Sequence, residues 1–181
     1  LFSKVAGALT AAGLNIFSAQ IFTRADGIVL DSFSVTAART GTVPEASARE
    51  IFQRTILSVL VDGADVGKAI ARAAQHGPLW QAAGGERMPT RIRFDNRTPA
   101  KCTIIDVEAE DRVGLLHALS VALAELGLDL ILAKIVTEKG AAIDSFYVRE
   151  WKTGQKEPGK VEDPARQQQI IARLEAAADA R

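Results

Sequence analysis

The sequence predicts an α+β fold built from two similar units, each with helices packed on one face of an antiparallel sheet. The first observation is a repeat: residues 1–35 return as residues 115–148, in a constant register of 114 until a turn where the first copy has one extra residue. The second is the hydrophobic periodicity, which changes within each copy from helical spacing to the alternation of strands. Such self-similarity indicates one structural unit used twice. Matched residues of the two copies include Leu1 and Leu115, Gly13 and Gly127, Ala19 and Ala133, Ile21 and Ile135, Asp31 and Asp144, and Phe33 and Phe146.

The first element of each copy is an amphipathic helix that ends at a glycine. In the second copy, leucines at spacings of four, four and three residues run from Leu115 to Leu126 and form one apolar stripe. In the first copy, Phe2 begins an equivalent stripe. We expect each helix to end where a left-handed glycine, Gly13 or Gly127, lets the last carbonyl groups find partners.

Two strands are predicted after each of these helices. Segments 14–23 and 128–137 are rich in Ile, Leu, Phe and Val, which favours strands. Glycine-containing turns at residues 25–27 and 139–140 then reverse the chain. Apolar residues alternate along the returning strands, and those predicted to share one face are Phe33 and Val35, or Phe146 and Val148.

Each copy then continues into a further helix. Residues 45–60 and 165–180 carry apolar side chains at helical spacing. The second of these helices follows Asp163 and Pro164, residue types favoured at the N-cap and in the first turn. A short extra helix is predicted over residues 65–76, in the first copy only, before a Gly-Pro stop.

Two more strands are predicted between the copies. Residues 101–108 alternate in hydrophobicity and predict the opening strand of the second copy. Residues 91–94 form a short strand with Ile92 and Phe94 on one face, which we assign as the last strand of the first copy. The resulting order, β-α-β-β-α-β, is that of the ferredoxin-like fold.

The turn-prone stretch 95–100 marks the boundary between the copies. We therefore predict one ferredoxin-like domain over residues 1–97, with a helical insert at about 63–77, and a second over residues 98–181. The first domain lacks its opening strand, and the second shows no closing strand after its last helix. Because a missing strand leaves ladder groups unpaired, we expect that residues ahead of Leu1 have been removed.

Composition excludes several classes of function. The 22 basic and 22 acidic residues balance, so no global field favours nucleic acid or an anionic membrane. No apolar run is long enough to predict a membrane span. The single cysteine, Cys102, suits a reducing compartment such as the cytoplasm. Neither histidine has a partner at the spacing of metal ligands, so no metal or other cofactor is predicted for these residues.

The second copy resembles an ACT domain, a small regulatory module that commonly binds amino acids. The residues that carry the resemblance are 109–135, AEDRVGLLHALSVALAELGLDLILAKI, and 142–148, AIDSFYV. Two such copies lie 114 residues apart, with a helical insert and PTRIRFDN ahead of the second. This order resembles the carboxy-terminal region of bacterial bifunctional uridylyltransferase/uridylyl-removing enzymes.

That resemblance implies a sensor of glutamine inside a larger enzyme. In such enzymes one domain transfers UMP to the nitrogen-signalling protein PII, a second domain removes it, and Mg²⁺ is expected in these catalytic domains. Nothing in the sequence matches a nucleotidyltransferase carboxylate pair or an HD histidine set, so this region is expected to regulate without catalysing. Its implied partners are the amino acid, the catalytic domains, PII and, through ACT pairing, a second copy of the chain.

The candidate ligand site is the loop that enters the helix of the second copy. Unpaired backbone N–H groups at a helix start suit the α-carboxylate of an amino acid. A glycine here lets ligand and backbone approach closely, and an aspartate can accept from the ligand's ammonium group. The loop departs from the usual ACT pattern, which has a proline where this chain has a valine. Its candidate residues are Asp111, Arg112, Val113, Gly114 and Leu115.

The ACT resemblance adds Asn15 and Ile16, because the loop of one copy usually faces the second strand of the other. Asn15 is a candidate to read a side-chain amide. Its counterpart Asp129 would face a loop that precedes Leu1, so only one of two equivalent sites is expected to form here.

Each candidate also has a structural interpretation. Asp111 suits an N-cap, Gly114 can serve tight packing, and Asn15 can satisfy a local turn. For Asp31 and Asp144, structural pairing at the sheet end is favoured over ligand chemistry. For the chain as a whole, a free-standing tandem ACT regulator and a purely structural dimerisation module stay open as alternatives.

Overall fold

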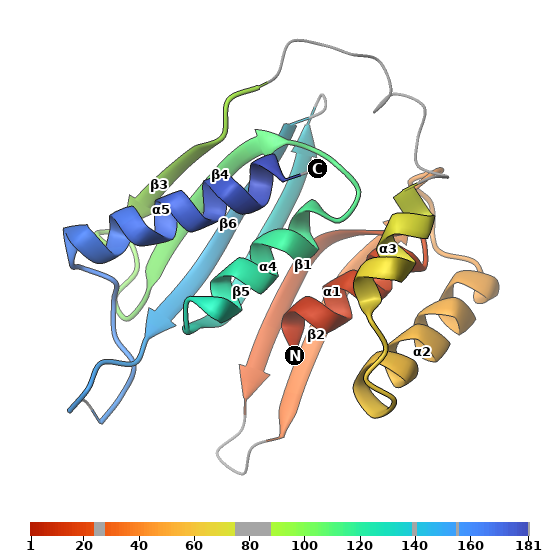
Figure 1. Ribbon diagram of the computed structural model, residues 1–181, viewed down its shortest axis with the longest axis horizontal. Helices are drawn as coiled ribbons and strands as arrows, with labels where there is room; N and C mark the ends of the chain where they lie inside the picture. Colours follow the sequence, from red (N-terminus) through yellow and green to blue (C-terminus); the bar gives the residue numbers. More distant parts are fainter. Residues whose placement is uncertain (24–27, 75–87, 139–140, 155, 181) are drawn as a thin grey trace.

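The computed structural model describes residues 1–23, 28–74, 88–138, 141–154 and 156–180. Within these residues one six-stranded antiparallel sheet has the order β2-β1-β5-β6-β4-β3, and helices cover one of its faces (Figure 1). The strands are β1 (Leu14–Thr23), β2 (Val29–Ala37), β3 (Arg91–Asp95), β4 (Thr103–Glu110), β5 (Leu128–Glu138) and β6 (Ala141–Glu150). The helices are α1 (Phe2–Ala11), α2 (Ala46–Val61), α3 (Val66–Ala74), α4 (Leu115–Glu125) and α5 (Pro164–Asp179).

The predicted α+β class is confirmed, as is the repeated order of helix, strand, strand and helix. The first unit contains α1, β1, β2 and α2, and the second contains β4, α4, β5, β6 and α5. Gly13 and Gly127 follow α1 and α4 with φ angles of 72° and 71°, the left-handed conformation expected of them. At the start of α5, Asp163 accepts a hydrogen bond from the backbone N–H of Ala165 at 3.0 Å. The predicted turns at 25–27 and 139–140 lie outside the described residues.

The assignment of residues 91–94 to the first unit is wrong. Strand β3 pairs antiparallel with β4, with Ile92 opposite Val107 and Phe94 opposite Ile105. It therefore lies at the far edge of the second unit and fills the place of that unit's closing strand. The physical reason is the short connection of residues 96–102, because adjacent antiparallel strands joined by a tight turn pair most readily. The division of the chain at residue 97 stays a prediction.

The two units meet edge to edge and helix to helix. Strand β1 pairs with β5 over three residues, from Ser18 to Gln20, which joins both half-sheets into one. Helices α1 and α4 pack side by side above this seam, with α2 and α3 beside α1 (Figure 1). The Nδ1 of His117 in α4 donates to the carbonyl of Ser3 in α1 at 2.7 Å. The apolar core continues across the seam, so the units are packed as one body.

The helical insert of the first unit packs against α1. A Cβ added to Gly7 of α1 would lie 2.8 Å from His117 Nδ1 and 2.9 Å from a methyl carbon of Val66 in α3. The absence of a side chain at Gly7 therefore lets α1, α3 and α4 approach one another closely.

None of the described helices combines the length and the apolar character needed to cross a bilayer.

Candidate functional site

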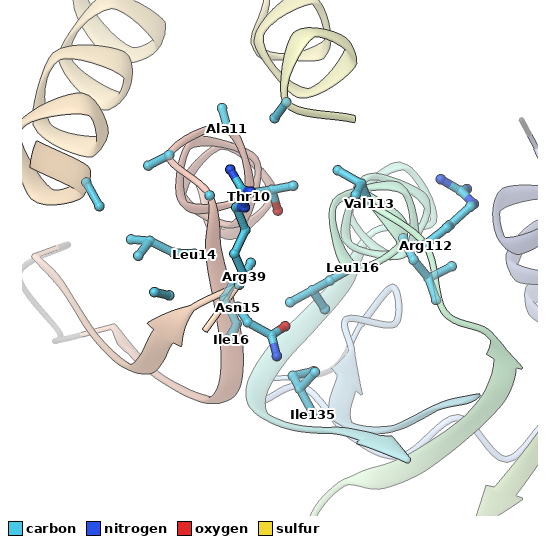
Figure 2. Close-up of a pocket in the computed structure, with 18 of the residues that line it drawn as sticks. Thr10, Ala11, Leu14, Asn15, Ile16, Arg39, Arg112, Val113, Leu116 and Ile135 are labelled. Carbon is cyan, nitrogen blue, oxygen red and sulfur yellow. The ribbon is translucent and has the colours of Figure 1, made fainter. Parts of the chain in front are cut away.

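A cavity of about 650 Å³ lies at the seam between the two units (Figure 2). The first unit contributes the end of α1 and the start of β1, and the second contributes the β4–α4 loop and residues of β5 and β6. All seven candidate residues line this one cavity, and their binding of a ligand stays a prediction. They are Asn15, Ile16, Asp111, Arg112, Val113, Gly114 and Leu115.

The β4–α4 loop enters α4 through a left-handed glycine. Gly114 is the N-cap residue, with φ 83° and ψ 3°, a conformation that a residue with a Cβ adopts only at a cost. Asp111 is therefore not the N-cap, contrary to its structural interpretation. A Cβ on Gly114 would lie 2.8 Å from Cγ2 of Ile70, so the glycine is required for packing against α3.

The same loop is packed against the helical insert through Val113. Its side chain joins a small apolar cluster with three buried residues of α2 and α3, namely Val59, Val66 and Ile70. The proline usual at this position in ACT domains would fix the loop through its own ring. Here the first unit's helices supply that restraint, so the second unit's loop is shaped by residues of the other unit.

Arg112 lines the cavity, but its guanidinium group is directed away from it, to the end of α5. Its Nη2 donates to the carbonyl of Ala177 at 2.8 Å, and its Nε donates to the carbonyl of Ala178 at 3.3 Å. These carbonyls end α5, where a cation interacts favourably with the helix dipole. Figure 2 shows the side chain of Arg112 pointing away from Asn15. Burial lowers the pKa of Arg112, and the nearby carboxylate of Asp111 opposes that shift. The guanidinium group thus anchors the loop to α5.

Asn15 and Ile16 bring the start of β1 to the opposite wall. Ile16 is buried in the core. Asn15 is half-buried, and its amide points toward Leu116 and Ile135 of the second unit (Figure 2). Leu14 and Ile16, on either side of Asn15, are both buried, and all three residues line the cavity. An amide group therefore faces the cavity across the seam.

Asp144, for which the sequence favoured structural pairing over ligand chemistry, also lines the cavity. It lies on β6 between Val107 of β4 and Ile135 of β5, and only 1% of its surface is exposed. Its Oδ1 has no hydrogen-bond partner among the described residues. Burial raises the pKa of Asp144 to about 8, the charge of Asp111 adds to the rise, and a backbone hydrogen bond from Val136 opposes it. The sequence predicted that the carboxyl group of Asp144 would pair with a structural partner, but its Oδ1 has none among the described residues.

The sequence feature that could have marked Asp144 as a cavity residue is the aspartate at the equivalent position of the first copy, Asp31. Asp31 lies opposite Ile21 on β2, as Asp144 lies opposite Ile135. Its Oδ1 also has no hydrogen-bond partner among the described residues, and burial raises its pKa. Both units therefore direct one carboxyl toward the helix side of the sheet at an equivalent position.

The equivalent of Asn15 in the second unit is differently engaged. Asp129 accepts from Arg149 Nη2 at 2.6 Å in an ion pair on neighbouring strands.

In the part of the chain that the structure describes, no three His, Cys, Asp or Glu side chains come together in a way that would hold a metal ion. Besides apolar groups, the polar side chains that line the cavity are those of Thr10, Asn15, Arg39, Ser47, Asp111, Arg112 and Asp144.

The fold and the cavity define the class of protein. It is an α+β protein of two ferredoxin-like units joined edge to edge, an architecture consistent with paired ACT domains. In sequence, the chain is similar to a short region of bifunctional uridylyltransferase/uridylyl-removing enzymes. The relative from Azospirillum brasilense is 36% identical over 152 residues, and that from Rhodospirillum rubrum is 32% identical over 150 residues. The relative from Gluconobacter oxydans is 33% identical over 150 residues.

Each of these alignments covers 83% of this chain and 16% of the relative. The chain therefore spans about one sixth of the length of the curated relatives that it matches. No family model matches the chain, and no solved structure gives a significant match.

Proposed function

We propose that this chain is an amino-acid-sensing regulatory module of a PII uridylyltransferase/uridylyl-removing enzyme, with glutamine as its ligand. The single observation that carries the proposal is a cavity whose walls come from both units, with Asn15 on one side and the 111–114 loop on the other. A ligand held across a seam stabilises one arrangement of the two units over others. Its binding free energy is then available to bias regions outside the module.

The chemistry of the cavity suits a zwitterion with a side-chain amide. The start of α4 offers backbone N–H groups and a partial positive charge for an α-carboxylate. Asn15 offers both a donor and an acceptor, the complement of a primary amide. Asp111 carries the opposite charge to an α-ammonium group and lines the same cavity. These three features together favour glutamine over glutamate, because a side-chain amide can both donate to and accept from Asn15, whereas a carboxylate can only accept.

Within this proposal the module regulates and the rest of the enzyme catalyses. The parent would add uridylyl groups to PII and remove them, with Mg²⁺ held outside these residues, and so control nitrogen metabolism in the cytoplasm. The catalytic domains are then the partner to which the module signals. A second copy of the chain is a further candidate partner, through pairing of the kind already seen between β1 and β5.

Calorimetric titration of the 181-residue chain with L-glutamine tests the proposal. We expect saturable binding of L-glutamine and weaker binding of L-glutamate and D-glutamine. Asn15→Leu should weaken binding of L-glutamine about 10-fold or more, the value of one lost hydrogen-bonded pair. The matched control is Gln20→Leu, an amide-to-leucine change at an exposed position of the same strand that does not line the cavity.

Two results would overturn the proposal. One is the absence of binding for L-glutamine and for every other common amino acid. The other is equal loss of affinity in the Asn15→Leu and Gln20→Leu variants, because that would place the ligand away from the seam.

A further inference from the structure

The recognition described above leaves the buried carboxyl of Asp144 without a role. Asp144 lines the cavity, and its neighbours across both adjacent strands are the apolar side chains of Val107 and Ile135. A polar atom buried without a partner costs about 1–3 kcal/mol, and a buried carboxylate costs more. The same feature recurs at Asp31 in the other unit. Asp31 is only half-buried, so the larger cost falls on Asp144, and a costly buried group indicates a role other than stability.

The charged groups around Asp144 show what it can receive. Asp111 lines the cavity and is close enough for its charge to raise the pKa of Asp144. Arg112 directs its guanidinium to the end of α5, and Arg39 lines the cavity from an exposed position after β2. On β5 and β6 the side chains adjoining Asp144 are apolar, namely Ile135 and Ala142. The floor of the cavity therefore presents carboxyl groups with no cation directed at Asp144 by the described residues.

We infer that Asp144 is the specificity-determining residue of this cavity and that its carboxylate, beside that of Asp111, receives the α-ammonium group of the bound amino acid. The inference rests on the proposed function. The contact with Asp144 would make the ligand's free amino group a requirement for tight binding. An ammonium group suits this place better than a metal ion, because no third carboxylate or imidazole joins Asp111 and Asp144 among the described residues.

Binding should then be linked to proton release. A carboxyl buried among apolar groups keeps its proton at neutral pH. When an ammonium group arrives beside it, the charged carboxylate becomes the favoured form, and the proton leaves for the buffer. Asp144 itself is the source of that proton, since the ammonium and α-carboxylate groups of the ligand stay ionised at pH 7.

The test compares L-glutamine with 4-carbamoylbutanoate, the same molecule without its amino group. The wild-type chain should prefer L-glutamine by about 10- to 100-fold, the range expected when a charged hydrogen-bonding pair is lost. In Asp144→Asn the preference should fall to within a few-fold. Asp106→Asn is the matched control, since Asp106 lies on neighbouring strand β4, accepts from Ser145 and does not line the cavity. It should keep the wild-type preference.

A second measurement needs no variant. Titrations of the wild-type chain with L-glutamine at pH 7 in phosphate and in Tris should differ in heat, because the two buffers take up the released proton with different enthalpies. Equal heats in both buffers would overturn the inference, as would an Asp144→Asn variant that folds and keeps the full preference. Either result leaves glutamine binding, and hence the proposed function, in place.

Other outcomes are also decisive. If the wild-type chain binds neither L-glutamine nor any other common amino acid, the proposed function fails and this inference fails with it. If Mg²⁺ binds tightly to the wild-type chain and not to Asp144→Asn, the carboxyl serves a metal ion and the inference is overturned.

Discussion

Ala19 lies opposite Ala133 where β1 meets β5, and these two residues are equivalent positions of the repeat. The flanking pairs are Ser18 with Lys134 and Gln20 with Leu132, and the offset of 114 residues converts one of these pairs into the other. A pseudo-two-fold axis therefore passes between Ala19 and Ala133. Each unit presents the same edge to the other, as in an isologous dimer made within one chain.

The small side chains at this axis are expected to be necessary. Ala19 and Ala133 are both fully buried, so Ala19→Leu should overpack the seam and lower the free energy of unfolding by about 1–3 kcal/mol. Gln20→Leu, which places the same side chain on the exposed face of β1, should change it by no more than about 0.5 kcal/mol. Urea unfolding followed by circular dichroism measures both. Equal effects of the two substitutions would argue against a tight seam.

Substitution by alanine should lower the free energy of unfolding more at Gly114 than at Gly127, a glycine with a similar backbone conformation. Both have left-handed φ angles, 83° and 71°, and each should lose about 1 kcal/mol from backbone strain alone. Only Gly114 has a neighbour that a Cβ would strike, Ile70 of α3. Gly114→Ala should therefore cost a further 1–3 kcal/mol or so, measured as the difference in unfolding free energy between the two variants. No difference would mean that α3 does not restrain the loop.

Asp144 should make the stability of the chain depend on pH. Its folded-state pKa of about 8 lies above the ordinary value of 3.8, so the folded chain holds a proton that the unfolded chain has released between these values. Stability is fully present below about pH 4 and falls as the pH rises toward 8, by up to about 1.4 kcal/mol per pH unit. Asp144→Asn should remove this slope, and Asp106→Asn should keep it. Urea unfolding at pH 5, 6, 7 and 8 provides the comparison, and parallel curves for all three chains would contradict it.

The 111–114 loop is restrained from two sides, and under the proposed function this restraint would carry the effect of a bound ligand to both units. Val113 and Gly114 contact α2 and α3 of the first unit, while Arg112 holds the end of α5 in the second. Under the proposed function, a ligand that moved this loop would shift helices in both units at once. The structure thus offers one two-sided element of the kind through which binding energy reaches distant regions.

Local elements and their duplication were determined by the sequence itself. The register of 114 residues, the helical stripe from Leu115 to Leu126 and the glycines Gly13 and Gly127 all depend on patterns within about ten residues. Such patterns decide whether a segment is a helix or a strand, because side-chain periodicity and backbone conformation are local properties. The candidate residues Asn15 and Asp111 were also found in the sequence, through the loop pattern and its ACT resemblance.

Only the tertiary structure decided which neighbours these elements have. It moved β3 to the second unit, turned Arg112 toward Ala177 and Ala178, and set Ile70 against Gly114. It also left Asp144 buried in a cavity that Asn15 of the other unit lines as well. These outcomes depend on contacts between residues far apart in the chain, whose partners are selected by packing and burial, and no local pattern records them.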